Sequence, residues 1–240
     1  MKFTTQLFTV VSIALIATGM LSCKDHLMGD EGKHDEDVYL NYETISDLRL
    51  PFDEEWHMTV AGKDHLHGGH HFITRGSGQR YAFDAVIYEN GNFFSGDGSK
   101  NEDHYCFGKN LFAPAGGVII EMENSIADNT VVGVEPEDLG ESTAAGNYIM
   151  IDHLNGEVSL MAHFKQGTII VNVGDTVVQG QEVGKAGNSG NSTAPHLHYH
   201  IQNGPGLLDG FGLPAMFNNY YADGVLVERG IPVQGQLVKN

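Results

Sequence analysis

Three histidines alternate with apolar residues within one short stretch of the chain. His196, His198 and His200 are separated by Leu197 and Tyr199, and in a β-strand the side chains two positions apart point to the same face. We therefore expect the three imidazoles to share one face of a strand, with the apolar residues against a core. Imidazole binds zinc and transfers protons near neutral pH. The alternative is a half-exposed strand whose three polar positions are histidine by chance. It is disfavoured because histidine is not a favoured surface residue.

A carboxylate inside an apolar strand is the second candidate for chemistry. Residues 80–88 alternate as a strand does, and Asp84 falls among apolar side chains. A buried charge needs a partner that offsets its desolvation, and a metal ion is one such partner for a carboxylate. A buried salt bridge is the alternative explanation.

Histidines also crowd the stretch before that strand, at His65, His67, His70 and His71. One of these four histidines could be a metal ligand. For any single one of them, a position in an exposed histidine-rich loop without a metal is the favoured interpretation. His163 ends an apolar stretch, Met-Ala-His-Phe, and taken alone it favours a structural role. A turn of glycine, serine and asparagine precedes the alternating histidines, and such a turn lets the backbone pass close to a ligand.

The elements that must position these residues are predicted to be mostly β-strands. The Asn155-Gly156 pair lies between two alternating apolar stretches, 146–152 and 157–164, which is a strong signal for a β-hairpin. The 31 glycines and the repeated short apolar runs favour strands and tight turns over long helices. Further strands are expected at 48–52, 55–62, 113–122, 168–173 and 176–183. The first two are expected at a sheet edge, the position to which Pro51 confines a strand.

Composition and charge limit the classes of partner. Hydrophobic residues make up 41% of the 240 residues, which is enough for the core of one domain. The formal net charge of −18 argues against nucleic acid as a partner, because phosphate binding needs basic patches. Of the two cysteines, Cys106 has no Cys-His signature around it, and we expect it to be a buried or free thiol.

The first residues predict export and a lipid anchor. Lys2 and a short apolar run precede Met-Leu-Ser-Cys, which ends at Cys23 and resembles a bacterial lipobox. We expect residues 1–22 to be a signal peptide and Cys23 to carry lipid; an ordinary secretory signal is the alternative. Residues 23–48 are rich in charge and show little regular alternation of polar and apolar residues, which is typical of a flexible tether. The expected location is therefore the cell envelope, as a membrane-anchored lipoprotein on the periplasmic or the surface side.

Residues 146–201 resemble the M23 zinc metallopeptidases of the lysostaphin and LytM type. The matching stretches are NYIMIDHLNGEVSLMAHF, VNVGDTVVQGQEVGKAGNSGNS and APHLHYHI, with APAGGVIIEM and QRYAFD upstream. The resemblance implies a mainly β fold, a compact antiparallel sheet domain of the duplicated-hybrid-motif type with long loops. We expect this domain to span residues 49–215, with residues 216–240 as a C-terminal extension.

The resemblance also implies a role for each candidate residue. His198 matches the family's second histidine of His-x-His and would be a zinc ligand with Asp84, while His196 and His163 would be the catalytic histidines. The family's remaining ligand is a histidine four residues before the aspartate, where this chain has Arg80. His71 is therefore expected to take that place across a longer loop, with His70 as the alternative.

The implied function is zinc-dependent hydrolysis of peptide bonds in peptidoglycan cross-links or stem peptides. Two histidines and one aspartate leave a fourth zinc position open for water, as catalytic sites require, and no HExxH motif is present to supply a glutamate base. An inactive M23-like domain that binds or regulates cell-wall enzymes is the main alternative. A biotinyl or lipoyl carrier domain, suggested by GDTVVQGQEVGK, is disfavoured because Lys185 is followed by Ala-Gly and a carrier needs no paired histidines.

Overall fold

The computed structural model describes residues 39–63, 78–134, 136, 140, 143–207 and 209–240. Within these ranges the chain forms strands and turns with no α-helix, and η2 (Asn101–Asp103) is a single turn of 3-10 helix. The expectation of a mainly antiparallel β fold is therefore confirmed. None of the described residues belongs to a helix long and apolar enough to cross a membrane.

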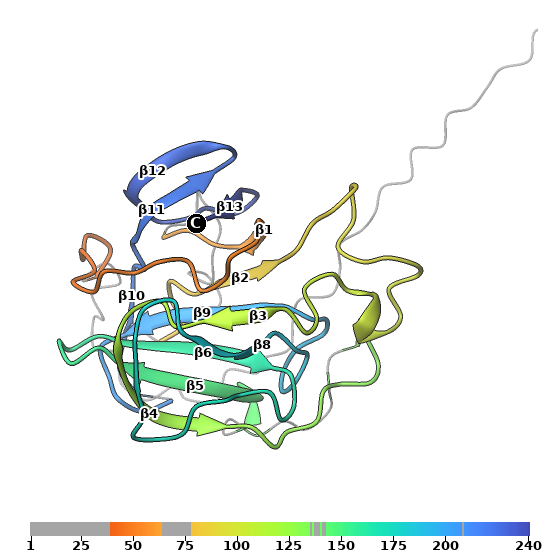
Figure 1. Cartoon of the computed structure of the whole chain (residues 1–240), viewed down its shortest axis with the longest axis horizontal. Coiled ribbons are helices and arrows are strands. Elements are labelled where there is room, and N and C mark those ends of the chain that lie inside the picture. The colour runs from red at the N-terminus through yellow and green to blue at the C-terminus, as the bar shows by residue number, and fades with distance from the viewer. Residues whose placement is uncertain (1–38, 64–77, 135, 137–139, 141–142, 208) are drawn as a thin grey trace, which may run out of the picture. The chain divides into compact units, whose positions relative to one another are not determined.

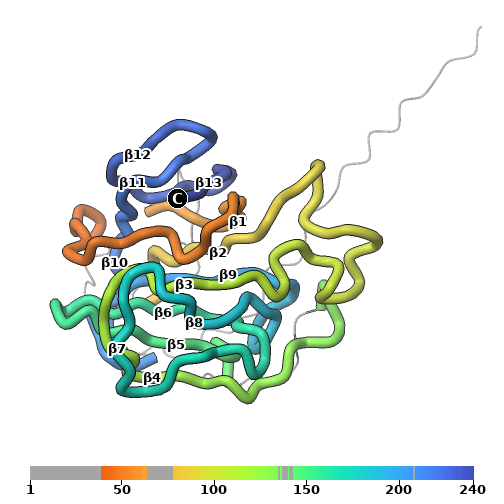
Figure 2. Tube along the Cα trace, in the orientation of Figure 1, coloured from red at the N-terminus to blue at the C-terminus, as the bar shows by residue number. Residues whose placement is uncertain are grey.

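The described strands form one large sheet and one strand pair (Figures 1 and 2). In chain order the strands are β1 (Trp56–Val60), β2 (Phe83–Val86), β3 (Asn110–Phe112), β4 (Gly117–Glu123), β5 (Asn147–Asp152), β6 (Val158–Phe164), β7 (Thr176–Val177), β8 (Glu182–Lys185), β9 (Leu197–Gln202), β10 (Gly212–Leu213), β11 (Phe217–Ala222), β12 (Val225–Gly230) and β13 (Leu237–Lys239). The large sheet has the order β12-β11-β13-β1-β2-β9-β6-β5-β4-β7, with β10 paired to β9, and β3 pairs with β8.

The hairpin predicted at Asn155-Gly156 is present as β5 and β6. These strands pair antiparallel, with Met150 opposite Leu160, and Gly156 takes a φ of 91° in the connecting turn. A residue with a side chain strongly disfavours that backbone conformation, which explains the glycine. The hairpin places His163 near the end of β6, beside β9.

The alternation predicted for residues 197–201 is confirmed in β9. Leu197, Tyr199 and Ile201 are fully buried in the main core, and the ring of Tyr199 packs 5.1 Å from that of Phe83 and 5.6 Å from that of Phe217. Burying a large apolar side chain stabilises the fold by about 1.5–3 kcal/mol. The core therefore fixes β9 and turns its histidine face to the opposite side of the sheet.

The strand pair β3–β8 covers the core face of the large sheet. In Figure 1 these two strands lie in front of β9 and β6, and Leu111 of β3 and Val183 of β8 belong to the same buried cluster as Met161 of β6 and Ile149 of β5. A smaller buried cluster lies on the strands β5 and β6 and includes Leu160. Because Leu160 is directly opposite His200, this smaller cluster is on the face that carries the histidines.

The expected edge position of the first strands is wrong. β1 lies inside the sheet between β13 and β2, because β11–β13 continue the sheet on that side. Residues 48–52 form no strand, and Leu48 makes a single bridge to Phe217. No strand occurs at 168–173, and the stretch expected at 176–183 is divided between β7 and the start of β8.

The peptidase domain was expected to begin at residue 49, but residues before this position already pack against the described fold. Thr44 and Ser46 are buried, and Glu157 is fully buried beside them. The Glu157 carboxylate accepts hydrogen bonds from the backbone N–H groups of Ile45 at 2.6 Å and Ser46 at 2.7 Å and from the Tyr42 hydroxyl at 2.9 Å. The division into tether, domain and extension stays a prediction, and Cys23 lies outside the described residues.

Glu157→Ala is expected to lower the free energy of unfolding by about 3 kcal/mol, since buried backbone donors left without an acceptor cost about 1–3 kcal/mol each. Chemical denaturation measures this change. Glu54→Ala is the control, because Glu54 pairs with Lys109 at 2.7 Å with both side chains well exposed, where an ion pair contributes little. Equal stability of the two variants would contradict the proposed role of Glu157 in holding residues 42–46.

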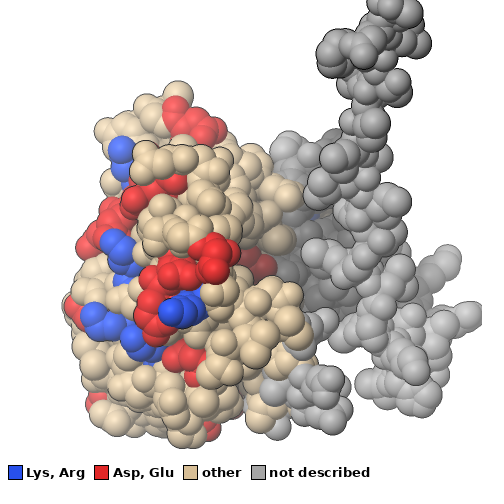
Figure 3. All heavy atoms as spheres, turned by 90° about the vertical axis from the view of Figure 1, so that its right-hand side faces the viewer, with Lys and Arg blue, Asp and Glu red and all other residues tan. Residues whose placement is uncertain are grey.

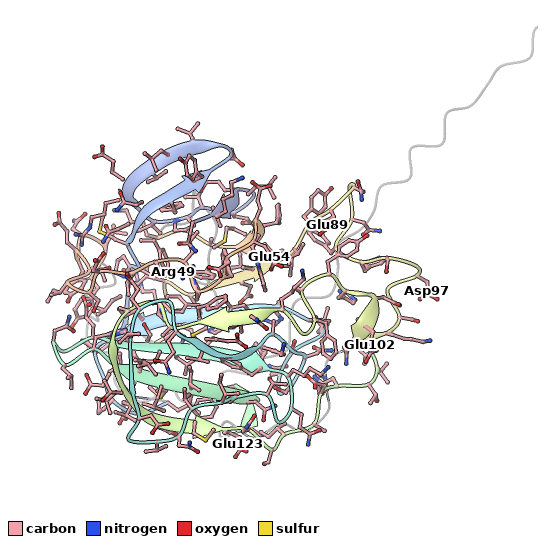
Figure 4. All side chains as sticks on the ribbon, in the orientation of Figure 1. Arg49, Glu54, Glu89, Asp97, Glu102 and Glu123 are labelled. Carbon is pink, nitrogen blue, oxygen red and sulfur yellow. The ribbon has the colours of Figure 1, made fainter. Side chains whose placement is uncertain are left out.

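The charged side chains outside the core lie on solvent-exposed segments. Glu89, Asp97 and Glu102 lie on the segment that projects from the sheet after β2 (Figure 4). Figure 3 shows acidic and basic side chains interspersed over the face that it displays. The histidines of β9 differ from these groups, because His198 and His200 are buried at 6% and 3% exposure.

Candidate active site

Strand pairing brings Asp84 and His198 together. β2 and β9 are antiparallel neighbours, and Asp84 is directly opposite His198 in their register. Directly opposite residues project their side chains to the same face, and Oδ1 of Asp84 lies 2.9 Å from Nδ1 of His198. The two side chains are 17% and 8% exposed. The carboxylate expected inside an apolar strand therefore has an imidazole as its neighbour, 114 positions away in sequence.

The two other predicted site histidines lie beside this pair. The ring centroid of His163 is 4.6 Å from that of His196 and 5.8 Å from that of His198. Nε2 of His196 lies 3.7 Å from Oδ1 of Asp84. Four of the five predicted site residues are thus gathered at β2, β6 and the beginning of β9, with His196 directly before that strand. The fifth, His71, lies outside the described residues, as does its alternative His70.

Backbone carbonyls orient both His163 and His196. Nδ1 of His163 is 2.8 Å from the carbonyl oxygen of Ser189, and Nδ1 of His196 is 2.9 Å from that of Ala194. A carbonyl oxygen only accepts hydrogen bonds, so each Nδ1 must carry the proton. In the neutral rings, Nε2 is then the atom that can accept a proton. Ser192 also contacts Nδ1 of His196 through its hydroxyl, at 3.2 Å.

The backbone at His163 is held in a left-handed conformation. Its φ is 62°, which costs a non-glycine residue about 1–2 kcal/mol. The surroundings fix this conformation: the N–H of His163 donates to the carbonyl of Ala145 at 3.1 Å, and its carbonyl accepts from the N–H of Gly187 at 2.9 Å. Such strain clusters at functional sites, where it helps to aim a side chain.

Burial makes His163 a neutral imidazole at pH 7. Desolvation lowers the pKa of His163 well below its ordinary value, and the nearby His196 and His198 lower the pKa further. The neutral ring is the form that accepts a proton. His163 is thus ready to act as a base near neutral pH.

The turn before β9 is rigidly braced by amide side chains. Nδ2 of Asn188 donates to Oδ1 of Asn101 at 2.8 Å, and the Ser192 hydroxyl donates to Oδ1 of Asn188 at 2.6 Å. Nδ2 of Asn129 donates to the carbonyls of Gly190 at 2.9 Å and Ser192 at 2.8 Å. This bracing holds the carbonyl that orients His163. The sequence predicted the turn, but it gave no signal that asparagines from two distant loops would brace it.

Two further polar side chains extend the site along β9. Nε2 of His198 lies 3.2 Å from Nδ1 of His200, and Nε2 of His200 lies 3.0 Å from Oε1 of Gln202. The expectation that His200 shares a face with His198 is confirmed. Gln202 was not among the predicted residues, although its i+2 spacing from His200 was a usable signal.

The donor chemistry at Asp84 and His198 fits a zinc ion. A carboxylate oxygen and an imidazole nitrogen are both zinc ligands, and here they approach each other across two paired strands. Among the residues that the structure describes, no group of three histidine, cysteine or acidic side chains is arranged to hold a metal ion. His71, with His70 as its alternative, stays the predicted third ligand and lies outside the described residues.

Cys106 takes no part in this site. Its side chain is buried and makes no disulfide, and its Sγ donates to the carbonyl of Pro195 at 3.1 Å. Burial raises the pKa of its thiol to about 12, so it stays protonated and is a poor nucleophile. The expectation of a buried thiol is confirmed.

Comparisons with known proteins find similarity to peptidases. Residues 104–209 match the model of peptidase family M23. Over 112 residues the chain is 35% identical to an uncharacterised metalloprotease of Buchnera aphidicola, covering 47% of this chain and 26% of that protein. Over 57 residues it is 42% identical to the peptidoglycan DD-endopeptidase ShyA of Vibrio cholerae, covering 24% of this chain and 13% of that protein. The chain thus spans about a quarter or less of the length of these two relatives.

A solved structure of a zinc-containing peptidase from Vibrio cholerae is also similar, with a TM-score of 0.39 and 19% identity over 65% of this chain and 36% of that one. The family match includes His163, His196 and His198 and begins after Asp84. The similarity of this chain to peptidase family M23 is thus located in residues 104–209.

Proposed function

We propose that this protein is a zinc-dependent metalloendopeptidase that hydrolyses peptide bonds in peptidoglycan cross-links or stem peptides. The observation that carries the proposal is the gathering of Asp84 and His198, 2.9 Å apart, with His163 and His196 around them. The family match and the name of the Vibrio cholerae DD-endopeptidase support the reaction and the substrate class.

Asp84, His198 and His71, or His70 in its place, would hold the zinc ion. When bound, zinc acidifies a water molecule and polarises the scissile carbonyl. The paired strands β2 and β9 set the spacing of Asp84 and His198, so these two ligands are in place before the metal binds. The burial of His198 keeps bulk water from competing for its nitrogen.

His163 and His196 would handle the proton and the developing oxyanion. Each has its Nδ1 proton held by a backbone carbonyl, so Nε2 is the atom that exchanges a proton with water or substrate. As a neutral imidazole, His163 can accept the proton of the attacking water. A protonated His196 can donate a hydrogen bond to the oxyanion and then a proton to the leaving amine.

The test is hydrolysis of purified peptidoglycan fragments by the full chain, with zinc measured on the same samples. Release of shorter peptides that depends on zinc supports the proposal. The same assay separates the main alternative, an inactive domain that binds or regulates cell-wall enzymes, because such a domain would release nothing even when it holds zinc.

We also propose that Cys23 carries lipid and anchors the protein to a membrane of the cell envelope. Cys23→Ser is expected to move the protein from the membrane fraction to the soluble fraction, because one acylated residue supplies the hydrophobic attachment. Fractionation with immunodetection measures the change, and Cys106→Ser is the control for the loss of a thiol. Mass spectrometry that finds an unmodified Cys23 in the native protein would overturn this proposal.

A further inference from the structure

Asn188 is a fully buried residue in the turn that precedes β9. Its backbone N–H donates to Oδ1 of Asp128 at 2.7 Å, and its carbonyl accepts from the N–H of Asn129 at 2.8 Å. Its side-chain Nδ2 donates to Oδ1 of Asn101 at 2.8 Å, and its Oδ1 accepts from the hydroxyl of Ser192 at 2.6 Å. Both the backbone and the side chain of Asn188 are thus held from outside the turn and from within it.

The contacts of Asn101 determine which way both amides face. Nδ2 of Asn101 donates to the backbone carbonyl of Asn129 at 2.7 Å, and a carbonyl oxygen can only accept a hydrogen bond. Oδ1 of Asn101 therefore faces Asn188, whose Nδ2 donates to it. The side-chain oxygen of Asn188 then faces Ser192, whose hydroxyl donates to it. A residue of η2 thus sets the direction of the hydrogen bonds as far as Ser192.

The turn held in this way carries the contacts of both predicted catalytic histidines. The carbonyl oxygen of Ser189, the residue that follows the buried amide, lies 2.8 Å from Nδ1 of His163. The hydroxyl of Ser192 lies 3.2 Å from Nδ1 of His196, and the carbonyl oxygen of Ala194 lies 2.9 Å from the same atom. A change in the shape of this turn therefore moves the two rings relative to each other.

The turn contains a glycine whose backbone needs outside support. Gly190 has a φ of 76°, and a Cβ atom there would lie 2.3 Å from the backbone nitrogen of Gly146. Glycine loses more conformational freedom on folding than any other residue, so hydrogen bonds from other segments stabilise the single shape of the turn. Asn101 supplies such a bond from 87 positions away, and it lies outside residues 104–209 of the family match.

We propose that Asn101 and Asn188 are positioning residues, which hold the rings of His163 and His196 at the separation that hydrolysis requires. The proposal rests on the proposed function in one respect, that these two histidines act in hydrolysis. The two amides act through Ser192 and the backbone of the turn. A misplacement of about 1 Å caused by a change remote from the chemistry can lower a rate about 10²-fold. The two amides should therefore affect the catalytic rate and leave zinc binding intact.

The experiment compares Asn101→Ala with Asn124→Ala in the zinc-loaded full chain. Asn124 is a matched control, because its amide also makes two hydrogen bonds, to the carbonyl of Ile169 at 3.1 Å and from the N–H of Ile169 at 3.2 Å. For Asn101→Ala, kcat on purified peptidoglycan fragments is expected to fall about 10²-fold, with KM and zinc content unchanged, whereas Asn124→Ala keeps its kcat. Equal kcat values in the two variants, or loss of zinc from Asn101→Ala, would overturn the proposal.

Asn101→Asp takes the place of the alanine variant if that variant does not fold. It keeps the size of the side chain, but an oxygen replaces the donor to the Asn129 carbonyl, so kcat is expected to fall here too. An unchanged kcat in Asn101→Asp would count against the proposal in the same way.

A double-mutant cycle with Ser192→Ala tests whether Asn101 acts through Ser192. The side chain of Asn188 joins these two residues, and residues in one hydrogen-bond network have effects that do not add. Asn101→Ala is therefore expected to lower kcat far less in the Ser192→Ala background than in the wild type. The same fold-change in both backgrounds would overturn the proposal, because independent residues have additive effects.

A third readout needs neither metal nor substrate. Crystal structures of the zinc-free protein are expected to show the rings of His163 and His196 displaced in Asn101→Ala from their wild-type centroid separation of 4.6 Å. Rings that stay in place in this variant would overturn the proposal. If the rings move, but the zinc-loaded wild type leaves peptidoglycan intact, the proposed hydrolysis fails and the role of the two amides in holding the rings stands.

Discussion

His198→Ala in the full chain is expected to abolish stoichiometric zinc binding and, with it, hydrolysis of cell-wall peptides. His198 supplies the imidazole nitrogen closest to the Asp84 carboxylate, at 2.9 Å, and losing one of three ligands leaves too few to hold the ion at its working concentration. Asp84→Ala should have the same effect from the other strand. Metal analysis after dialysis against a weak chelator measures both.

A matched control for this loss is His104→Ala. His104 is also a buried histidine, and its ring contacts the carbonyl of Gly98 at 3.2 Å, not the predicted ligands. It should therefore keep stoichiometric zinc, which separates loss of a ligand from loss of any buried imidazole. If both His198→Ala and Asp84→Ala retain stoichiometric zinc, the ligand assignment is wrong.

His163→Ala and His196→Ala are expected to keep zinc but to lower the rate of hydrolysis by at least about 10²–10⁴-fold, the usual contribution of general acid–base catalysis. The rings of His163 and His196 lie 4.6 Å apart beside the predicted ligands. Their Nδ1 atoms are held by the carbonyls of Ser189 and Ala194. They can therefore exchange protons through Nε2 without holding the metal. Turnover of purified fragments, with zinc measured on each sample, tests this.

The left-handed backbone at His163 calls for a second variant at that position. Asparagine tolerates a positive φ better than alanine does. We therefore expect His163→Asn to keep the fold and the bound zinc and to lower the rate of hydrolysis as His163→Ala does. A loss of zinc in any of these variants would make the substituted histidine a ligand and would require a different site.

Local patterns in the sequence predicted the parts of the fold that depend on neighbours along the chain. The period of two around Leu197 and Tyr199 predicted both faces of β9, and Asn155-Gly156 predicted the hairpin of β5 and β6. Both signals act over a few residues, where side-chain direction and turn chemistry are set by the backbone itself.

Long-range pairing could not be derived in the same way. β1 was expected at an edge because nothing near Trp56–Val60 indicates that Leu237–Lys239 will pair with it. The register that sets Asp84 opposite His198 joins strands more than a hundred positions apart. The burial of Glu157 under residues 42–46 is a long-range contact as well. Such contacts arise from the packing of the whole sheet, which local propensity does not encode.

The roles of the predicted site residues stay predictions, but the structure shows which of them lie together and what contacts them. Asp84, His163, His196 and His198 lie together, whereas backbone carbonyls hold the rings of His163 and His196 and Gln202 contacts the neighbouring His200. Carbonyl contacts leave no trace in residue identity, because every residue has the same backbone group. Gln202 differs in this respect, since its spacing from His200 marked it as a residue on the same face.

The most direct measurement is mass spectrometry of purified peptidoglycan incubated with the zinc-loaded full chain, with His163→Ala under the same conditions. We predict that the wild-type chain releases peptides with new amino and carboxyl ends at one type of bond, and that the variant, with zinc retained, releases almost none. Intact peptidoglycan after incubation with fully zinc-loaded wild-type protein would contradict the proposed hydrolysis and favour a domain that binds the cell wall or its enzymes.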